Sequence, residues 1–66
     1  MNNNELKITM AAARVNAGLT QSDIAKAMQL SKTTVLSWEK GKVKPKLAQL
    51  EMFCRICNIN VENIAI

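Results

Sequence analysis

The sequence predicts an all-α protein of four or five short helices packed around one core. Apolar residues recur at helical spacing four or five times along the 66 residues, and each recurrence is bounded by capping or helix-ending residues. Strand signals are weak, because no segment alternates cleanly and the aromatic residues are limited to Trp38 and Phe53. A chain of this length has room for one small core, so we expect a single compact domain over residues 1–66.

The first two expected helices lie in the amino-terminal half. The first spans about residues 5–17, with Asn3 or Asn4 as its cap. Its apolar stripe consists of Leu6, Met10, Ala13 and Ala17. The second helix begins after Thr20, whose hydroxyl can accept the backbone N–H of Asp23, and it ends near Met28.

The third expected helix follows a tight connection formed by residues 29–31. Ser31 is a good cap for a helix over residues 32–40, and Gly41 suits its end. Val35 and Trp38 stand three positions apart, so they share one face, which we expect to be buried.

The last part of the chain predicts a longer helix and a short one. The longer helix opens at Pro45 or Lys46 and ends at Asn58, and the short one spans residues 61–65 after a cap at Asn60. The inward stripe of the longer helix comprises Leu47, Leu50, Cys54 and Cys57, with Phe53 and Ile56 beside it.

The two cysteines are the only residues that suggest metal or redox chemistry. Cys54 and Cys57 form a CxxC, but a zinc site needs four ligands and a second pair is missing. A thioredoxin-like motif needs a βαβ setting, which the sequence does not indicate. We therefore interpret both as buried core residues and expect no metal, no cofactor and, since the chain has no His and no glycine-rich phosphate loop, no enzymatic activity.

The charge balance suggests the kind of partner. Nine Lys and Arg residues against five acids give a net charge of +4, which in a small domain favours a polyanion. The amino terminus, MNNNELK, lacks the apolar region of a signal peptide, and no segment approaches the roughly 20 apolar residues of a membrane span. We expect a cytoplasmic, nucleoid-associated protein with no membrane partner.

The second and third helices are expected to form a helix-turn-helix over about residues 20–40. Two short helices joined by three residues define this unit, and neither is long enough to be stable alone. The apolar positions that would hold the pair together are Ile24, Ala25, Met28, Leu30, Val35 and Trp38. Ala25 is small enough to let the two helices approach closely.

The run TQSDIAKAMQLSKTTVLSWEKGKVKP resembles the phage Cro and repressor family of helix-turn-helix proteins, also called xenobiotic-response-element-like. The matching pieces are Gln21, Ala25, Val35 and the string WEKG at 38–41, followed by a basic segment with Pro45. The likeness covers about residues 5–65. It implies a lambda-repressor-like DNA-binding domain whose third helix lies in the major groove of double-stranded DNA.

The resemblance also implies which side chains face DNA. By position, the base contacts would come from Gln21, Lys32, Thr33, Leu36 and Ser37. The phosphate contacts would come from Thr20, Gln21, Ser31, Thr34, Lys40, Lys42, Lys44 and Lys46. The chemistry agrees, because Lys32 could donate to guanine, Thr33 could meet a base or a thymine methyl, and an exposed Leu36 could touch a thymine methyl. Gln21 could also brace Lys32 or Thr33.

Two further features follow from the resemblance. Arg14 and Glu39 occupy positions that pair as a largely buried salt bridge in similar proteins, so we interpret them as structural. The family usually has a left-handed Gly between the two helices, whereas this chain has Gln29. We expect that departure to change the turn slightly and to tilt the recognition helix.

These observations predict a sequence-specific transcriptional regulator, a repressor or Cro-like switch protein of the size typical of phages and mobile elements. A homodimer would read a pseudo-palindromic operator, with Ile59, Val61 and Ile64 as interface candidates, some of which must close the core. No segment suggests a small-molecule ligand. The alternative is a helix-turn-helix protein-interaction module, such as an antitoxin or adaptor, that does not read bases.

Overall fold

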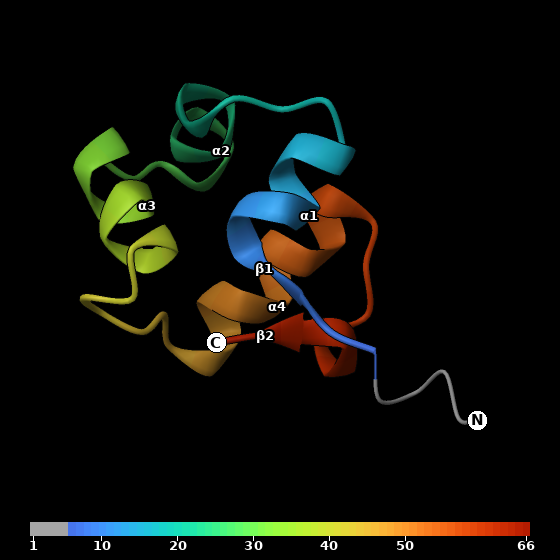
Figure 1. The fold of residues 1–66 in the computed structure, drawn as a ribbon. Helices are drawn as coiled ribbons and strands as arrows, with labels where there is room; N and C mark the ends of the chain where they lie inside the picture. Colours follow the sequence, from blue (N-terminus) through green and yellow to red (C-terminus); the bar gives the residue numbers. More distant parts are fainter. Residues whose placement is uncertain (1–5) are drawn as a thin grey trace.

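In the computed structural model, residues 6–66, the part of the chain that the structure describes, form a mostly helical bundle (Figure 1). The elements in chain order are β1 (Ile8–Thr9), α1 (Met10–Asn16), α2 (Gln21–Met28), α3 (Lys32–Glu39), α4 (Leu47–Cys57), the 3-10 turn η2 (Val61–Asn63) and β2 (Ile64–Ala65). The predicted helical fold class is confirmed. No helix within this range is long and apolar enough to cross a bilayer.

The first helix begins later than predicted. The hydroxyl of Thr9 accepts the backbone N–H of Ala12 at 3.0 Å, which makes Thr9 the cap of α1. Ile8 and Thr9 form a short strand, residues 6 and 7 have no regular structure, and the side chain of Leu6 is 65% exposed instead of contributing to the apolar stripe. The caps predicted at Asn3 and Asn4 lie outside the described residues. Thr9 stands two positions before an alanine run, and this local cap, which the prediction did not include, sets the start of the helix.

The predicted last helix is also wrong. Residues 61–63 form a single 3-10 turn, and β2 then pairs in parallel with β1, with Ile8 opposite Ile64. The side-chain amide of Asn63 donates to the backbone carbonyl of Leu6 at 3.0 Å and secures the same junction. This pairing joins the two ends of the described chain, and such long-range pairing leaves no mark in a local residue pattern.

Helices α2, α3 and α4 closely match their predicted limits, because each has a strong local cap. Thr20 and Asp23 form a reciprocal capping box on α2, and Ser31 caps α3 through the N–H of Thr34 at 3.1 Å. The end of α4 is marked by Asn58 in the left-handed conformation. One residue of the predicted α4 stripe is misplaced, since Leu47 is 66% exposed.

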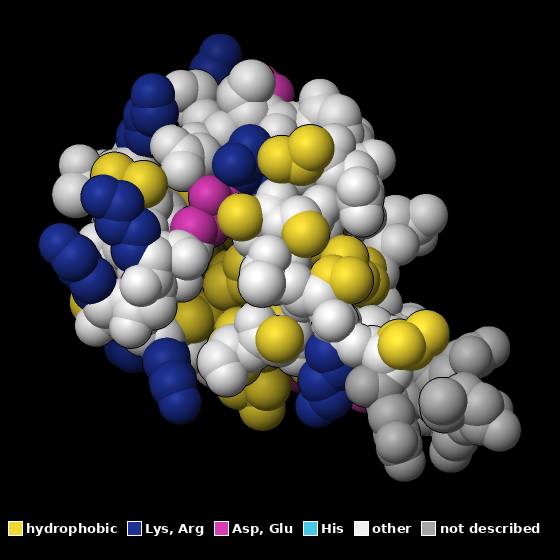
Figure 2. Space-filling view, viewed as in Figure 1, with side chains coloured by type: hydrophobic (Ala, Val, Ile, Leu, Met, Phe, Trp, Pro, Cys, Tyr) yellow, Lys and Arg dark blue, Asp and Glu magenta, His cyan; other side chains and the backbone are white. Residues whose placement is uncertain are grey.

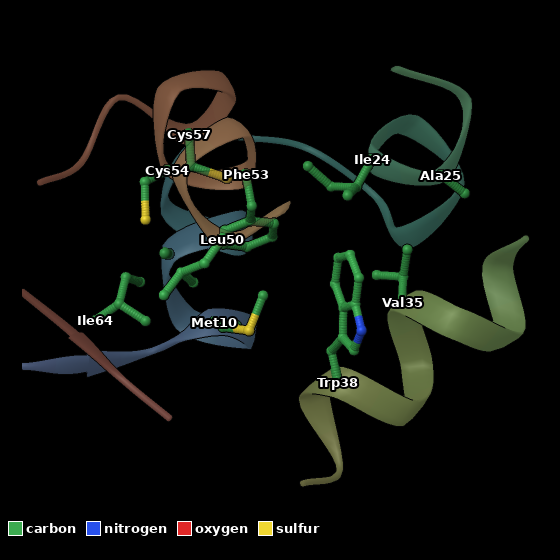
Figure 3. Packing of buried hydrophobic residues seen from close by; sticks show 11 residues of the cluster. Met10, Ile24, Ala25, Val35, Trp38, Leu50, Phe53, Cys54, Cys57 and Ile64 are labelled. Atoms are coloured by element: carbon green, nitrogen blue, oxygen red, sulfur yellow. The ribbon is translucent and has the colours of Figure 1, made fainter. Parts of the chain in front are cut away.

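A single apolar core joins all four helices and β2. Figure 3 shows the indole of Trp38 reaching from α3 into the interior, between side chains of α1 and α4 on one side and of α2 on the other. The buried residues are Met10, Ala13, Ile24, Ala25, Val35, Trp38, Leu50, Phe53, Cys54, Cys57 and Ile64. Both cysteines are free and buried, and burial raises the pKa of each thiol, so they act as small apolar residues, as predicted.

The turn between α2 and α3 keeps the left-handed geometry without a glycine. Gln29 has φ 57° and ψ 44°, and the next residue, Leu30, donates its N–H to the carbonyl of Ala25 at 2.8 Å. Gln29 therefore adopts the left-handed conformation that the resemblance implies for a glycine, which strains the backbone at this residue.

Replacing Gln29 with Gly is expected to raise the free energy of unfolding by about 0.5–1 kcal/mol, because glycine adopts this conformation without the Cβ penalty. Thermal or urea unfolding measures the change. Asn58→Gly is the matched control, since Asn58 has nearly the same φ of 58° but asparagine tolerates it better. A gain at Asn58 as large as that at Gln29 would contradict this explanation.

Candidate nucleic-acid interface

Helices α2 and α3 pack as the predicted helix-turn-helix. Ile24 and Val35 are fully buried between them, and Ala25 is buried at the small-residue position that allows close approach. Trp38, one turn after Val35, ties α3 to the rest of the core. This packing uses one face of α3 and leaves the opposite face toward solvent.

The outward face of α3 carries the four predicted base-contact residues of this helix. Lys32 and Thr33 are exposed in the first turn, and Leu36 and Ser37 follow one turn later, on the same side of the helix. Leu36 is half-buried and not exposed as predicted. The arrangement offers an ammonium, two hydroxyls and an apolar edge within two helical turns.

The start of α2 is more constrained than the sequence suggests. The N–H of Thr20 donates to the Asp23 carboxylate at 2.8 Å, and the N–H of Asp23 donates to the Thr20 hydroxyl at 3.0 Å. Hydrogen bonding with Thr20 lowers the pKa of Asp23, and the bond from the backbone N–H of Thr20 has the largest effect. The capping box leaves the backbone N–H groups of Gln21 and Ser22 at the positive helix end for an anion.

The hydroxyls of Ser31 and Thr34 are partly committed to the fold. They lie 3.0 Å apart, and the Ser31 oxygen also accepts the Thr34 N–H. A hydroxyl has one donor and two acceptor sites, so either residue can still donate to or accept from one further group.

Four lysines lie in the segment that follows α3. Lys40, Lys42, Lys44 and Lys46 are all exposed. The backbone N–H of Lys42 donates to the carbonyl of Ser37 at 3.0 Å, which folds the segment back on the end of α3. Figure 2 shows Lys and Arg side chains gathered on the side of the molecule formed by α3 and this loop. A basic surface therefore borders the outward face of α3.

A largely buried ion pair joins the first and third helices. The Nε of Arg14 donates to Glu39 at 2.6 Å, and the two side chains are 14% and 7% exposed. Arg14 also donates to the carbonyl of Leu19 at 2.9 Å, so one guanidinium connects α1, the α1–α2 loop and α3. The pair that the resemblance implied is present, and it links α1 to the last turn of α3.

Sequence reasoning missed the third member of this network. The side-chain amide of Gln21 donates to Glu39 at 3.0 Å, so Gln21 braces the end of α3 and not Lys32 or Thr33. The contact joins residues 18 positions apart, and no local pattern announces it. An amide nitrogen carries two hydrogens, so one remains available for a phosphate or a base.

The network changes the ionisation of both charged partners. Burial disfavours the Glu39 carboxylate, but the hydrogen bonds from Arg14 and Gln21 outweigh it, so the pKa of Glu39 lies below its ordinary value of 4.5. The hydrogen bond to Glu39 raises the pKa of Arg14. Both groups are held in their charged forms at neutral pH.

The lowered pKa of Glu39 predicts acid sensitivity. A carboxyl whose pKa is lower in the folded than in the unfolded state stabilises the fold above about pH 4.5, and that stabilisation is lost as pH falls through the folded pKa. We expect the free energy of unfolding to fall below about pH 5. Glu39→Gln should make the fall shallower, whereas Asp23→Asn should remove only a smaller, exposed contribution. An unchanged acid profile in Glu39→Gln would contradict this.

The three dimer-interface candidates occupy different environments. Ile64 is 4% exposed and closes the core from β2, so it is not available to a partner. Ile59 is half-buried and packs against the core, whereas Val61 is 37% exposed. Of the three, Val61 offers the most accessible surface.

Comparison with known proteins agrees with this geometry. The model of a family described as "Helix-turn-helix" matches residues 10–64. A protein of Archaeoglobus fulgidus, named as an uncharacterized HTH-type transcriptional regulator, is 32% identical over 53 residues, which cover 80% of this chain and 76% of the relative. No solved structure matches significantly. The chain belongs to the Cro/repressor-type helix-turn-helix family, and it is a DNA-binding regulator of that class.

Proposed function

We propose that residues 1–66 act as a single sequence-specific DNA-binding domain, a repressor or Cro-like switch protein that reads the major groove with α3. The observation that carries the proposal is the division of α3 into two faces. Val35 and Trp38 hold it to the core, while Lys32 and Thr33 are exposed at its start and a lysine-rich loop follows its end. Exposed polar side chains on a firmly packed helix are what base readout requires.

Each group of side chains has a role in this proposal. Lys32, Thr33, Leu36 and Ser37 contact base edges, and Gln21 contacts a base or phosphate with its free amide hydrogen. The lysines at 40, 42, 44 and 46 grip phosphates, together with Thr20, Ser31 and Thr34. Phosphate contacts set the register of α3 on the duplex, and base contacts supply the specificity.

We further propose that the protein acts as a homodimer on a pseudo-palindromic operator in the cytoplasm, as phage and mobile-element regulators do. One recognition helix covers only a few base pairs, so two half-sites about one helical turn apart give useful specificity. Ile59 and Val61 are the interface candidates that the core does not bury.

The phosphate grip predicts a salt effect. Lys42→Ala is expected to lower the slope of log affinity against log salt concentration by about 0.9, because one fewer counterion is released on binding. Titrating a fluorescent duplex with protein at several salt concentrations measures the slope. Lys7→Ala is the matched control, since Lys7 is exposed but precedes β1, and it should leave the slope unchanged. Equal slopes for the Lys42 variant and the unchanged protein would show that Lys42 does not contact a phosphate.

A further inference from the structure

A small pocket opens between the end of α3, the loop after it and the carboxyl ends of the two strands. Its volume is about 260 Å³. Met10 and Trp38 line it from the core, and Val43 and Ile66 line it from the surface, where they are 55% and 58% exposed. Figure 2 shows hydrophobic side chains in the hollow between α3 and β2. The lining comes from segments far apart in the sequence, so sequence analysis had no reason to expect a ligand here.

The pocket also has a charged side. Lys40 and Lys44 line it, and both are exposed at its solvent edge. Glu39 is the acidic lining residue, but its carboxylate accepts hydrogen bonds from Arg14 and Gln21, and its side chain is only 7% exposed. Among the lining side chains, the exposed charges are therefore those of Lys40 and Lys44, and both are positive.

We propose that this pocket binds a small amphipathic carboxylate. The apolar part lies against Met10 and Trp38, and the carboxylate accepts hydrogen bonds from Lys40 and Lys44, which are stronger when both partners are charged. The volume lies just below the range of roughly 300–1,000 Å³ typical of pockets for drug-sized molecules, so an acid with one ring or a short chain fits best.

The ligand regulates DNA binding, a consequence that rests on the proposed function. Lys40 and Lys44 belong to the proposed phosphate grip, so a bound carboxylate neutralises charges that DNA phosphates would otherwise engage. Each ligand then weakens the binding of the other by the same factor, as linkage requires.

The direct test uses Trp38, the one tryptophan in the chain, as a fluorescent reporter inside the site. The purified protein is titrated with 3-phenylpropionate and with its neutral analogue 3-phenylpropanamide. We expect a saturable change in Trp38 emission with the acid and binding at least tenfold weaker with the amide. No saturable change, or equal affinity for the two compounds, would overturn the proposal.

Two variants from the same loop locate the site. Lys44→Gln removes a lining cation and should weaken acid binding by about fivefold to tenfold. Lys42→Gln makes the same charge change at an exposed residue that does not line the pocket, so it should leave acid binding unchanged. Equal losses in the two variants would indicate a diffuse effect of net charge and would overturn the assigned site.

The regulatory step is tested on a fluorescent duplex at constant ionic strength. Saturating 3-phenylpropionate should weaken DNA binding severalfold, and the amide should not. Acid binding without any change in DNA affinity would overturn the regulatory step. Failure of the proposed function is distinguishable, because it appears as an absence of salt-dependent DNA binding before any acid is added.

Discussion

Replacing Glu39 with alanine is expected to lower the free energy of unfolding by about 3 kcal/mol. The substitution leaves the Arg14 guanidinium, which is 14% exposed, without its carboxylate, and removal of one partner from a buried pair typically costs about 3–5 kcal/mol. We place the value at the lower end because Arg14 keeps its hydrogen bond to the carbonyl of Leu19 and some contact with water. Urea unfolding followed by circular dichroism measures the loss.

Two further variants separate a buried charge from a general loss of packing. Arg14→Met combined with Glu39→Leu removes both charges, and we expect it to recover part of the stability lost in the single variant. Glu51→Ala removes an exposed acid of α4 and should change stability by less than about 0.5 kcal/mol. If Glu39→Ala costs no more than Glu51→Ala, the pair is not the structural element that we describe.

The second large effect concerns DNA recognition. Lys32→Ala is expected to weaken binding to the preferred site by about 1–3 kcal/mol and to relax preference at one base position, because Lys32 is exposed in the first turn of α3 where it can reach a guanine. A fluorescence titration against the preferred duplex and against its single-base variants measures both effects.

Lys42→Ala provides the contrast for Lys32→Ala. It also removes one positive charge, but from the loop after α3, so it should weaken binding to all sequences about equally. If the two variants lose affinity uniformly across sequences, Lys32 is a phosphate contact and not a base contact.

The parts of the fold that sequence analysis predicted are those with local signals. The Thr20 cap, the Ser31 cap and the Asn58 end each depend on residues within one helical turn, and each lies where it was predicted. The burial of Val35 and Trp38 also follows from their spacing on one short helix.

The errors arose where distant segments meet. The pairing of Ile8 with Ile64 connects opposite ends of the described residues. Its strands occupy residues 8–9 of the predicted first helix and residues 64–65 of the predicted last one. Leu47 was assigned to the core from its spacing, yet its position at the first turn of α4 leaves it in solvent. Helical spacing alone does not show whether another element covers a given position.

Some features of the candidate site could likewise be predicted from local spacing, and others could not. Sequence spacing alone places Lys32, Thr33, Leu36 and Ser37 on one face of α3. Of these four residues, Lys32 and Thr33 are exposed, as that placement predicts. The contact from Gln21 to Glu39 and the pocket beside Trp38 depend on three-dimensional packing.

The most direct test of the central claim is selection from a random pool of duplex DNA by the purified protein, at about 150 mM salt so that nonspecific phosphate binding is weak. Sequencing the bound fraction reveals any preferred site. We predict a pseudo-palindrome whose half-sites lie about one helical turn apart. A folded protein that enriches no motif would contradict specific reading by α3, and the helix-turn-helix would then serve a protein partner.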